Sequence, residues 1–396
     1  MKVAYFVHDL GDAAVAKRVW MLRAAGAEVC LAGFRRTAEP PASVAGIAPL
    51  DLGRTQDARL LSRAGSVLGN LALAPMRGRF LAGADVVLAR NLEVYAVAAF
   101  ARALHAPRAK LAYECLDVHR LMLSQGLAGR ALRGLESRLL ARSGALIVSS
   151  PAFLSEYFGP FQRLSQRQGL TALVVENKAY PDAGAAPALV ATRKTPQKAP
   201  WRIGWYGMVR CRRSLDFLCG LARRRPDLVQ VDIRGKPSYT EFDDFDRQTA
   251  EVPGVTFGGP YRPEELPALY GALHFNWSVD YFQDEGNSRW LLPNRLYEGG
   301  RFGVPPIART DSETGRWLQA HSLGALFERP EAELEAFLDA LTPDAYAAMR
   351  ARHAAAPQAL FVMGPEDCER LLAAICGPEA EAGRRLAPPA STLLRA

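Results

Sequence analysis

Short runs of β-branched and aromatic residues alternate with stretches of helical apolar spacing along the first half of the chain. This alternation is typical of a parallel sheet that carries helices on both faces. The predicted strands are Lys2–Val7, Glu28–Phe34, Ala84–Ala89, Lys110–Glu114, Ala145–Ser149 and Leu173–Glu176, and the predicted helices span 13–25, 92–104, 127–141 and 151–158.

The pattern stops at 181–200, where the sequence is rich in Ala, Pro and Lys and has no periodic apolar face, as in a surface linker. It then restarts. The second set of predicted strands is Trp201–Tyr206, Val229–Ile233, Val255–Phe257, His274–Trp277, Val304–Ala308 and Ala325–Phe327. After a helical stretch at 365–375, repeated prolines and low β-propensity predict a mobile tail.

The sequence therefore predicts an α/β protein with two Rossmann-like, doubly wound domains. The first spans 1–180, 181–200 is the linker, the second spans 201–364, and 365–396 forms a C-terminal helix and tail. A length of 396 residues fits two such cores.

Composition narrows the class of protein. Hydrophobic residues make up 49% of the chain and charged residues 23%, as in a soluble globular protein. Asp9 interrupts the opening apolar run where a signal peptide would continue, and no stretch has the roughly 18 uncharged apolar residues of a membrane span. We expect a cytoplasmic protein whose six cysteines, without CxxC or zinc-like spacing, are reduced and structural.

The net charge of +8 is uneven, because residues 1–150 hold 20 Lys and Arg against 11 Asp and Glu. Two readings stay open: a solvated surface, or a basic face that contacts anionic lipid or a phosphorylated acceptor at the inner face of the membrane. No nucleic-acid-binding motif accompanies the arginines. The basic residues in question include Arg35, Arg36, Arg54, Arg59, Arg63, Arg77 and Arg79.

A phosphate-binding arrangement opens the second domain. Gly207 is expected at the end of the first strand, with Arg210 and Arg213 before a helix that begins near Ser214. Glycine permits close backbone approach, helix N-terminal amides attract anions, and guanidinium groups bind phosphate oxygens. A purely structural glycine with nearby surface arginines is the alternative.

A second candidate lies at PNRLYEGGRFGVPPIA, where a helix should start after Pro293. Asn294 and Glu298 then share one face at the carboxyl ends of the strands, where open α/β sheets bind ligands. A carboxylate there can accept hydrogen bonds from two ribose hydroxyls. The alternative is a surface salt bridge from Glu298 to Arg295 or Arg301.

These motifs resemble the GT-B glycosyltransferases, most closely the family 4-like enzymes of bacterial exopolysaccharide assembly. VVENKAYP, with Asn177, is similar to the family's segment at the domain junction, GMVRCRRSLDFL to its phosphate loop with Arg213 at the lysine position, and PNRLYEGG to its Pro-Asn-Lys-x-x-Glu helix. YECLDVHRL, SSPAFLSEYF and NSRWLLPNRLYEGG together look similar to succinoglycan-type glucosyltransferases.

The chain also departs from the family pattern. Trp290 stands eight positions before Glu298, where the family has a first glutamate, and Leu116 replaces the family histidine. Glu285 is nearby and is a further candidate contact to the sugar.

The resemblance implies that the second domain binds a nucleotide-diphosphate sugar, most simply a UDP-sugar, and that the first binds a lipid-linked or oligosaccharide acceptor. Arg210 and Arg213 would stabilise the leaving diphosphate without a metal or cofactor. For a catalytic base, Asp117 is the first choice, His119 the second and Glu114 the third, although any of them can instead cap the next helix or pair with Arg120. The acceptor-side candidates at the end of the first strand are His8, Asp9 and Gly11, with a helix-cap role for Asp9 or Asp12 as the alternative.

Other functions compete with this one. A sugar-nucleotide epimerase or hydrolase, or a catalytically silent scaffold, would keep the same fold. An NAD-dependent oxidoreductase would need GxGxxG after the first strand, which VHDLGDAAVAK does not supply. Asp243, Asp244 and Asp246 resemble a metal-binding motif, but an acidic first helical turn explains them equally well.

Overall fold

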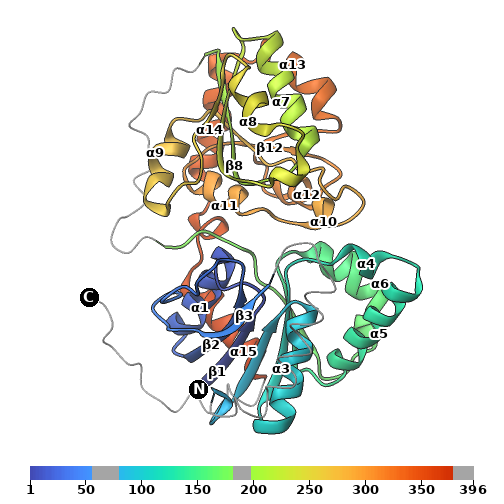
Figure 1. Ribbon diagram of the computed structural model, residues 1–396. Coiled ribbons are helices and arrows are strands. Elements are labelled where there is room, and N and C mark those ends of the chain that lie inside the picture. Colours follow the sequence, from blue (N-terminus) through green and yellow to red (C-terminus); the bar gives the residue numbers. More distant parts are fainter. Residues whose placement is uncertain (56–79, 182–197, 378–396) are drawn as a thin grey trace. The chain divides into compact units, whose positions relative to one another are not determined.

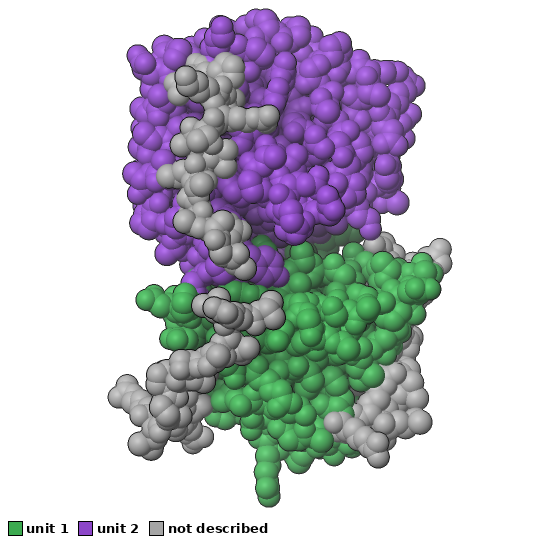
Figure 2. Space-filling view, turned by 90° about the vertical axis from the view of Figure 1, so that its left-hand side faces the viewer, with its two compact units in different colours: residues 1–149, 157–175, 365–396 green, residues 150–156, 176–364 purple. Residues whose placement is uncertain are grey.

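The computed structural model describes residues 1–55, 80–181 and 198–377. Most of the predicted linker at 181–200, the predicted tail beyond 377 and the arginines at 59, 63, 77 and 79 lie outside the described residues. The chain divides into two compact units, coloured separately in Figure 2. Unit 1 comprises 1–149, 157–175 and 365–396, and unit 2 comprises 150–156 and 176–364.

Unit 1 is built on a parallel sheet of strand order β3-β2-β1-β4-β5-β6-β7. Each strand predicted from the sequence overlaps an observed one, and β3 was missed because its short run LDLGR carries polar residues and a glycine. The strands are β1 (Lys2–Val7), β2 (Glu28–Arg35), β3 (Leu50–Arg54), β4 (Val86–Arg90), β5 (Lys110–Cys115), β6 (Ala145–Val148) and β7 (Thr171–Val174).

Helices of unit 1 follow the strands in the predicted order. The segment predicted as a helix at 151–158 is largely the π-helix η2. The elements are α1 (Ala13–Ala24), α3 (Leu92–His105), α4 (Arg120–Leu123), α5 (Leu127–Leu140), α6 (Gly159–Gln162), the 3₁₀-helix η3 (Leu164–Gln166) and α15 (Pro365–Cys376). η2 (Phe153–Phe158) is divided between the units, since its residues 153–156 belong to unit 2.

The C-terminal helix α15 belongs to unit 1, although it follows unit 2 in the sequence. It packs against α1 and β7, and its orange-red ribbon lies among the blue elements in Figure 1. The apolar side chains of Leu371, Leu372 and Ile375 are buried there. The last helix therefore completes the core of the first unit.

Unit 2 contains a second parallel sheet, of order β10-β9-β8-β11-β12-β13. Its core includes the fully buried Trp201, Trp205 and Trp277, which lie on β8 and β11. The strands are β8 (Trp201–Val209), β9 (Val229–Pro237), β10 (Val255–Phe257), β11 (Phe275–Trp277), β12 (Pro306–Arg309) and β13 (Ala325–Phe327).

Helices alternate with these strands, as the sequence predicts for a doubly wound sheet (Figure 1). They are α7 (Arg212–Arg224), η4 (Tyr239–Glu241), α8 (Phe245–Ala250), η5 (Pro263–Glu265), α9 (Leu266–Gly271), α10 (Asn287–Trp290), α11 (Asn294–Arg301), α12 (Glu313–Ala320), α13 (Pro330–Ala340), α14 (Pro343–Ala355) and η6 (Gln358–Leu360). Among the described residues, every helix is too short or too polar to cross a bilayer.

Candidate functional site

The candidate donor site lies where the strand order of unit 2 changes direction, between β8 and β11. The chain leaves β8 toward α7 and leaves β11 toward α10, so the two loops flank the same point of the sheet edge. Ligands of open parallel sheets bind at such a switch point, outside the carboxyl ends of the strands. The site is therefore built on the loop after β8, the loop after β11, and α11.

Arg210 is held at this point by two contacts with the loop after β11. Its Nη2 lies 3.8 Å from Oδ2 of Asp280, and its guanidinium carbon lies 4.7 Å from the ring centroid of Phe282. Asp280 is itself fixed, because its Oδ1 accepts a 2.9 Å hydrogen bond from the Phe282 amide. The first predicted arginine is therefore preorganised at the switch point.

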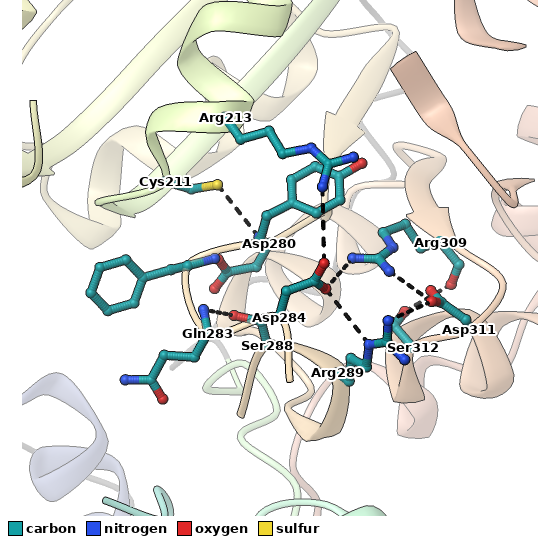
Figure 3. A network of polar contacts seen from close by, with 12 residues as sticks. Cys211, Arg213, Asp280, Gln283, Asp284, Ser288, Arg289, Arg309, Asp311 and Ser312 are labelled. Atoms are coloured by element: carbon teal, nitrogen blue, oxygen red, sulfur yellow. Dashed lines mark hydrogen bonds and ion pairs between the residues drawn. The ribbon is translucent and has the colours of Figure 1, made fainter. Parts of the chain in front are cut away.

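Arg213 belongs to a cluster of three arginines around Asp284 (Figure 3). Its Nη1 lies 3.9 Å from Asp284 Oδ2, Nε of Arg289 lies 3.7 Å from Oδ1, and Arg309 donates to the same carboxylate. Arg213 and Arg309 also lie over the ring of Tyr281, at 4.0 and 4.8 Å. The sequence predicted Arg213, but it did not point to Arg289, Arg309 or Asp284.

Two more carboxylates complete this arginine cluster. Asp311 Oδ2 lies 2.6 Å from Nη2 of Arg309 and 3.4 Å from Nη2 of Arg289, and Glu331 accepts a 2.6 Å hydrogen bond from Nε of Arg213. Burial lowers the pKa of Arg309, but its bonds to Asp311 and Asp284 outweigh that effect and raise it. Arginines held ready by exchangeable carboxylates can take phosphate oxygens in their place.

Asn294 and Glu298 lie four residues apart on α11, as the sequence predicts. Asn294 is half-buried, and its Oδ1 has no hydrogen-bond partner among the described residues. Glu298 Oε2 lies 3.3 Å from the hydroxyl of Tyr270 on α9, which donates to it. Arg295 and Arg301 donate to the backbone carbonyls of Val279 and Tyr180, respectively. Glu298 thus has hydroxyl groups as neighbours.

Arg295 is a buried cation that the sequence did not single out. Its Nη2 donates to the carbonyl of Val279 at 3.2 Å, and its Nε has no partner among the described residues. Burial lowers the pKa of Arg295, an effect that nearby Asp280 opposes. A positive charge thus lies beneath the loop after β11, next to Asp280.

Gly207 needs a correction: it lies within β8, which runs on to Val209, and not at the strand end. It pairs with Gly235 of β9, and both have positive φ, 106° and 130°. A Cβ on Gly235 would come within 1.8 Å of the Gly207 carbonyl oxygen, so the backbone of β8 leaves no room for a side chain at Gly235. Helix α7 also begins at Arg212, two residues earlier than predicted.

Glu114 also needs a correction, because it is a structural group and not an available base. It is fully buried in unit 1, where Nε of Arg18 donates at 2.5 Å, Nε of Arg90 at 2.9 Å, and the Tyr5 hydroxyl at 2.5 Å. Burial alone would raise the pKa of Glu114, but the two guanidinium groups lower it to about 2. A carboxylate so firmly ionised and enclosed has little capacity to take a proton.

The other two candidate bases follow β5 and are exposed. The carbonyl oxygen of Asp117 accepts a 3.5 Å contact from the thiol of Cys115, which fixes the loop. Nδ1 of His119 accepts a 3.2 Å hydrogen bond from the Leu121 amide and so caps the short helix α4. The structure thus leaves the Asp117 carboxylate on the surface and gives His119 a local structural task.

On the acceptor side, His8, Asp9 and Gly11 lie directly after β1. Asp9 accepts a 3.0 Å hydrogen bond from the Gly11 amide and lies 3.0 Å from Nε of Arg36. Nε2 of His8 lies 3.9 Å from Oδ2 of Asp12, which is the residue that caps α1. Burial lowers the pKa of His8, an effect that Asp12 partly offsets.

Three remaining predictions have clear positions. Glu285 is exposed, beside the arginine cluster in sequence. Asp244 caps α8 through the Arg247 amide, and Asp243 pairs with Arg212. Among the described residues, no group of three or more His, Cys, Asp or Glu side chains could hold a metal ion.

The fold of the whole chain is that of known sugar-transferring enzymes. The structure of Anabaena Alr3699/HepE with UDP-glucose is 13% identical and superposes with a TM-score of 0.65 over 98% of this chain and all of that one. Sucrose-phosphate synthase from Thermosynechococcus elongatus gives 0.67 at 16% identity, over 98% and 99% of the two chains. The chain therefore has the GT-B fold of glycosyltransferases. No family model matches the sequence.

The particular family comes from a relative in sequence. The succinoglycan biosynthesis protein ExoL of Rhizobium meliloti (strain 1021) is 42% identical over 377 residues, which cover 94% of this chain and 92% of that protein. The chain belongs to the family of this succinoglycan biosynthesis protein. The resemblance stated from the sequence motifs is confirmed.

Proposed function

We propose that the chain is a glycosyltransferase that moves a hexose from a UDP-sugar to a lipid-linked or oligosaccharide acceptor in exopolysaccharide assembly. The family relation to a succinoglycan biosynthesis protein supports the process, and the likeness to a fold bound to UDP-glucose supports the donor class. The observation that carries the proposal is the convergence of Arg210, the arginine cluster and α11 on the switch point of unit 2.

The chemistry of transfer matches the charges of this site. Breaking the bond between sugar and phosphate develops negative charge on the leaving nucleoside diphosphate. Arg210 and Arg213 stabilise that charge when phosphate oxygens replace Asp280 and Asp284 as their partners. Glu298 accepts hydrogen bonds from the ribose hydroxyls. In this proposal the positively charged guanidinium groups stabilise the diphosphate in place of a metal ion, and neither a metal nor a cofactor is required.

The acceptor is bound by unit 1 in this proposal, and its hydroxyl loses a proton as it attacks. Asp117 and His119 are both exposed after β5, and we place Asp117 first for the base because Nδ1 of His119 accepts a backbone hydrogen bond. In this proposal we keep Asp117 before His119 and drop Glu114, which is buried and firmly ionised.

A membrane-facing surface is a second part of the proposal, and it lies elsewhere than the sequence indicated. Arg35 and Arg36 are paired with Asp51 and Asp9. Helices α3 and α5 contact each other and leave large apolar side chains exposed among arginines. We call the following the α3–α5 face: Phe100, Leu104, Arg108, Leu127, Arg130, Leu135, Arg138 and Arg142.

The α3–α5 face suits an anionic bilayer. Leu127, Ala131 and Leu135 repeat every four residues and so share one side of α5, with Leu127 77% exposed. Apolar side chains enter the interface, and each arginine near an anionic surface adds about 1 kcal/mol. We propose that this face brings the enzyme to a lipid-linked acceptor.

Calorimetric titration with UDP-, GDP- and ADP-sugars, in the presence of a chelator, tests the donor site. UDP-glucose should bind the wild type, and Glu298→Ala and Arg213→Ala should each weaken binding about 10-fold or more, since a hydrogen bond to a charged group contributes roughly 1.5–3 kcal/mol. Glu251→Ala, an exposed carboxylate of unit 2, is the matched control. A folded wild type that binds no nucleotide sugar would favour the silent scaffold.

Turnover separates the remaining alternatives. A transferase releases UDP in proportion to glycosylated acceptor, whereas a hydrolase releases free sugar, and an epimerase leaves the nucleotide sugar intact with altered stereochemistry. Product analysis by mass spectrometry and NMR distinguishes the three.

Vesicle sedimentation tests the α3–α5 face. The wild type should sediment with vesicles that contain phosphatidylglycerol and less with pure phosphatidylcholine, and binding should fall as salt rises. The double variant Leu127→Glu/Leu135→Glu should lose at least tenfold in partitioning, while Tyr239→Glu, at an exposed aromatic residue of unit 2, should not. Equal sedimentation of both variants would contradict this surface assignment.

A further inference from the structure

Unit 1 has a switch point of its own, and two polar side chains there each have one buried atom without a hydrogen-bond partner among the described residues. The strand order changes direction between β1 and β4. Phe6 pairs with Ala89 in parallel register, and His8 and Asn91 are the first residues after β1 and β4, respectively. Neighbouring parallel strands lie about 4.8 Å apart. Both residues thus follow neighbouring strands at the edge where open sheets bind ligands.

Asn91 is held in a backbone conformation that non-glycine residues rarely adopt. Its φ is 68° and its ψ is 154°, in a region populated almost only by glycine. The conformation is fixed on both sides, because its amide donates to the Glu114 carbonyl at 3.0 Å and its carbonyl accepts from the Tyr95 amide at 2.9 Å. Strain of this kind persists where the rest of the structure enforces it, and it concentrates at functional sites.

Among the described residues, no hydrogen bond to its side-chain oxygen stabilises Asn91 in this conformation. It precedes α3, where an asparagine ordinarily accepts a hydrogen bond from the first turn, but it makes no capping bond. Its Oδ1 is buried and has no partner among the described residues. Buried polar atoms are almost always paired, so this oxygen calls for a donor from outside the chain.

His8 presents the same feature from the neighbouring strand. Its side chain is 19% exposed, and its Nδ1 is buried without a partner among the described residues. The charged groups around it come from several elements: Asp12 at the start of α1, Arg90 at the end of β4, Glu93 in the first turn of α3, and Arg36 after β2. A ring nitrogen in this setting can donate to or accept from a hydroxyl group.

A rigid base supports both residues. Directly before Asn91, Arg90 is fully buried and bonded to Glu114, and its Nη2 also donates to the carbonyl of Ala14 on α1 at 3.0 Å. The buried ion pairs of Glu114 with Arg90 and Arg18 join β5 to β4 and α1, and the Tyr5 hydroxyl adds a hydrogen bond from β1. This preorganises the edge on which His8 and Asn91 stand.

From this geometry we infer that His8 and Asn91 form a sugar-binding subsite in unit 1, which holds hydroxyl groups of the acceptor. The inference rests on the proposed function for its ligand class, because an acceptor sugar offers adjacent hydroxyls that both donate and accept. Asn91 Oδ1 accepts from one hydroxyl, and the His8 ring bonds to its neighbour. Asn91 is a specificity-determining residue, and its strained backbone is what directs the side chain to the ligand.

The decisive variant is Asn91→Gly, because glycine adopts this conformation without strain and lacks the side chain. A functional asparagine predicts opposite changes: the melting temperature rises by about 2–4 °C, as expected for roughly 1 kcal/mol in a unit of this size, while sugar binding weakens about 10-fold. A structural asparagine predicts a fall in melting temperature. Ala45→Gly, which relieves the left-handed φ of 47° elsewhere in unit 1, is the matched control and should stabilise the protein without affecting sugar binding.

Sugar binding is measured by saturation-transfer NMR with octyl β-glucoside, octyl β-galactoside and octyl α-mannoside, beside a UDP-glucose titration of every variant. We expect at least one glycoside to bind the wild type and to bind Asn91→Gly and His8→Ala about 10-fold more weakly, with UDP-glucose affinity unchanged within twofold. Unaltered glycoside binding in both variants, or no glycoside binding to the wild type, would overturn the subsite. If the wild type does not bind UDP-glucose, the proposed function itself would be overturned.

Discussion

At the residue scale, two buried carboxylates of unit 1 have opposite pKa shifts because one is bonded to charged groups and the other to neutral groups. Glu114 faces two arginines, so its charge is favoured and its pKa falls to about 2. Glu136 on α5 is equally buried, but its partners are neutral: Tyr113, Tyr157 and Gln162 donate to it. Burial therefore raises the pKa of Glu136 to about 7, despite these hydrogen bonds.

The raised pKa of Glu136 predicts a pH dependence of stability. The native state retains this proton up to about pH 7, whereas an unfolded glutamate loses it near 4.5, so the stabilisation is complete below pH 4.5 and is lost as pH rises through 7. The window of about 2.5 units corresponds to up to about 3 kcal/mol. Glu136→Gln should reduce the difference in urea unfolding free energy between pH 5 and pH 8.

Glu156→Gln, an exposed carboxylate on η2, is the control and should leave that difference unchanged. If Glu136→Gln and wild type show the same pH dependence, Glu136 is ionised in the native state at neutral pH, and the raised pKa is wrong.

The same two residues show why the site was only partly predictable from sequence. Glu114 ends the predicted strand and precedes Asp117 and His119, so its position along the chain matched that of a base. The two arginines that neutralise it, Arg18 and Arg90, are 96 and 24 residues away in sequence. No local pattern encodes such pairs, because they form only when α1, β4 and β5 pack together.

At the element scale, periodicity located the strands well but not their last residues. The apolar run of β8 ends at Tyr206, yet the strand continues through Gly207 to Val209 because Gly235 allows β9 to approach it closely. The expected glycine turn was therefore placed three residues too early. The arginines that follow still lie beside the switch point, since their position depends on strand order and not on the exact strand end.

Elements that lack a regular period were harder to assign. Residues 153–158 form a π-helix, whose five-residue hydrogen-bond spacing leaves no mark distinct from that of an α-helix in a short sequence. The arginine cluster around Asp284 also escaped prediction, because its members come from α7, α10, β12 and an irregular loop. In the sequence alone, the charged residues of this cluster are indistinguishable from solvent-exposed ones, because only the fold brings them together.

At the scale of the whole molecule, the N-terminal unit depends on the C-terminal helix. The carbonyl of Cys376, at the end of α15, accepts a hydrogen bond from Nζ of Lys110 on β5, and its sulfur lies beside the Met1 side chain. The sequence predicted α15 as a helix but assigned it no partner. An amphipathic pattern predicts that a helix buries one face. It does not predict which part of the protein covers that face, because that depends on the tertiary fold.

Truncation after Gly364 should therefore unfold unit 1 while unit 2 stays folded. Among the side chains removed, Leu371, Leu372 and Ile375 are buried, and each contributes about 2 kcal/mol. Their sum approaches the roughly 5–15 kcal/mol that stabilises a whole domain. Hydrogen exchange should show loss of protection in β1, β4 and β5 and retained protection in β8 and β9.

A truncation after Gly377 keeps α15 and is the matched control, which should protect all five strands as the full chain does. The two truncations also separate folding from donor binding. Because the switch point of unit 2 is built without α15, the chain ending at Gly364 should still bind UDP-glucose, while the octyl glycosides should no longer bind. Retained protection of β1 in that shorter chain would mean that the core of unit 1 is complete without its last helix.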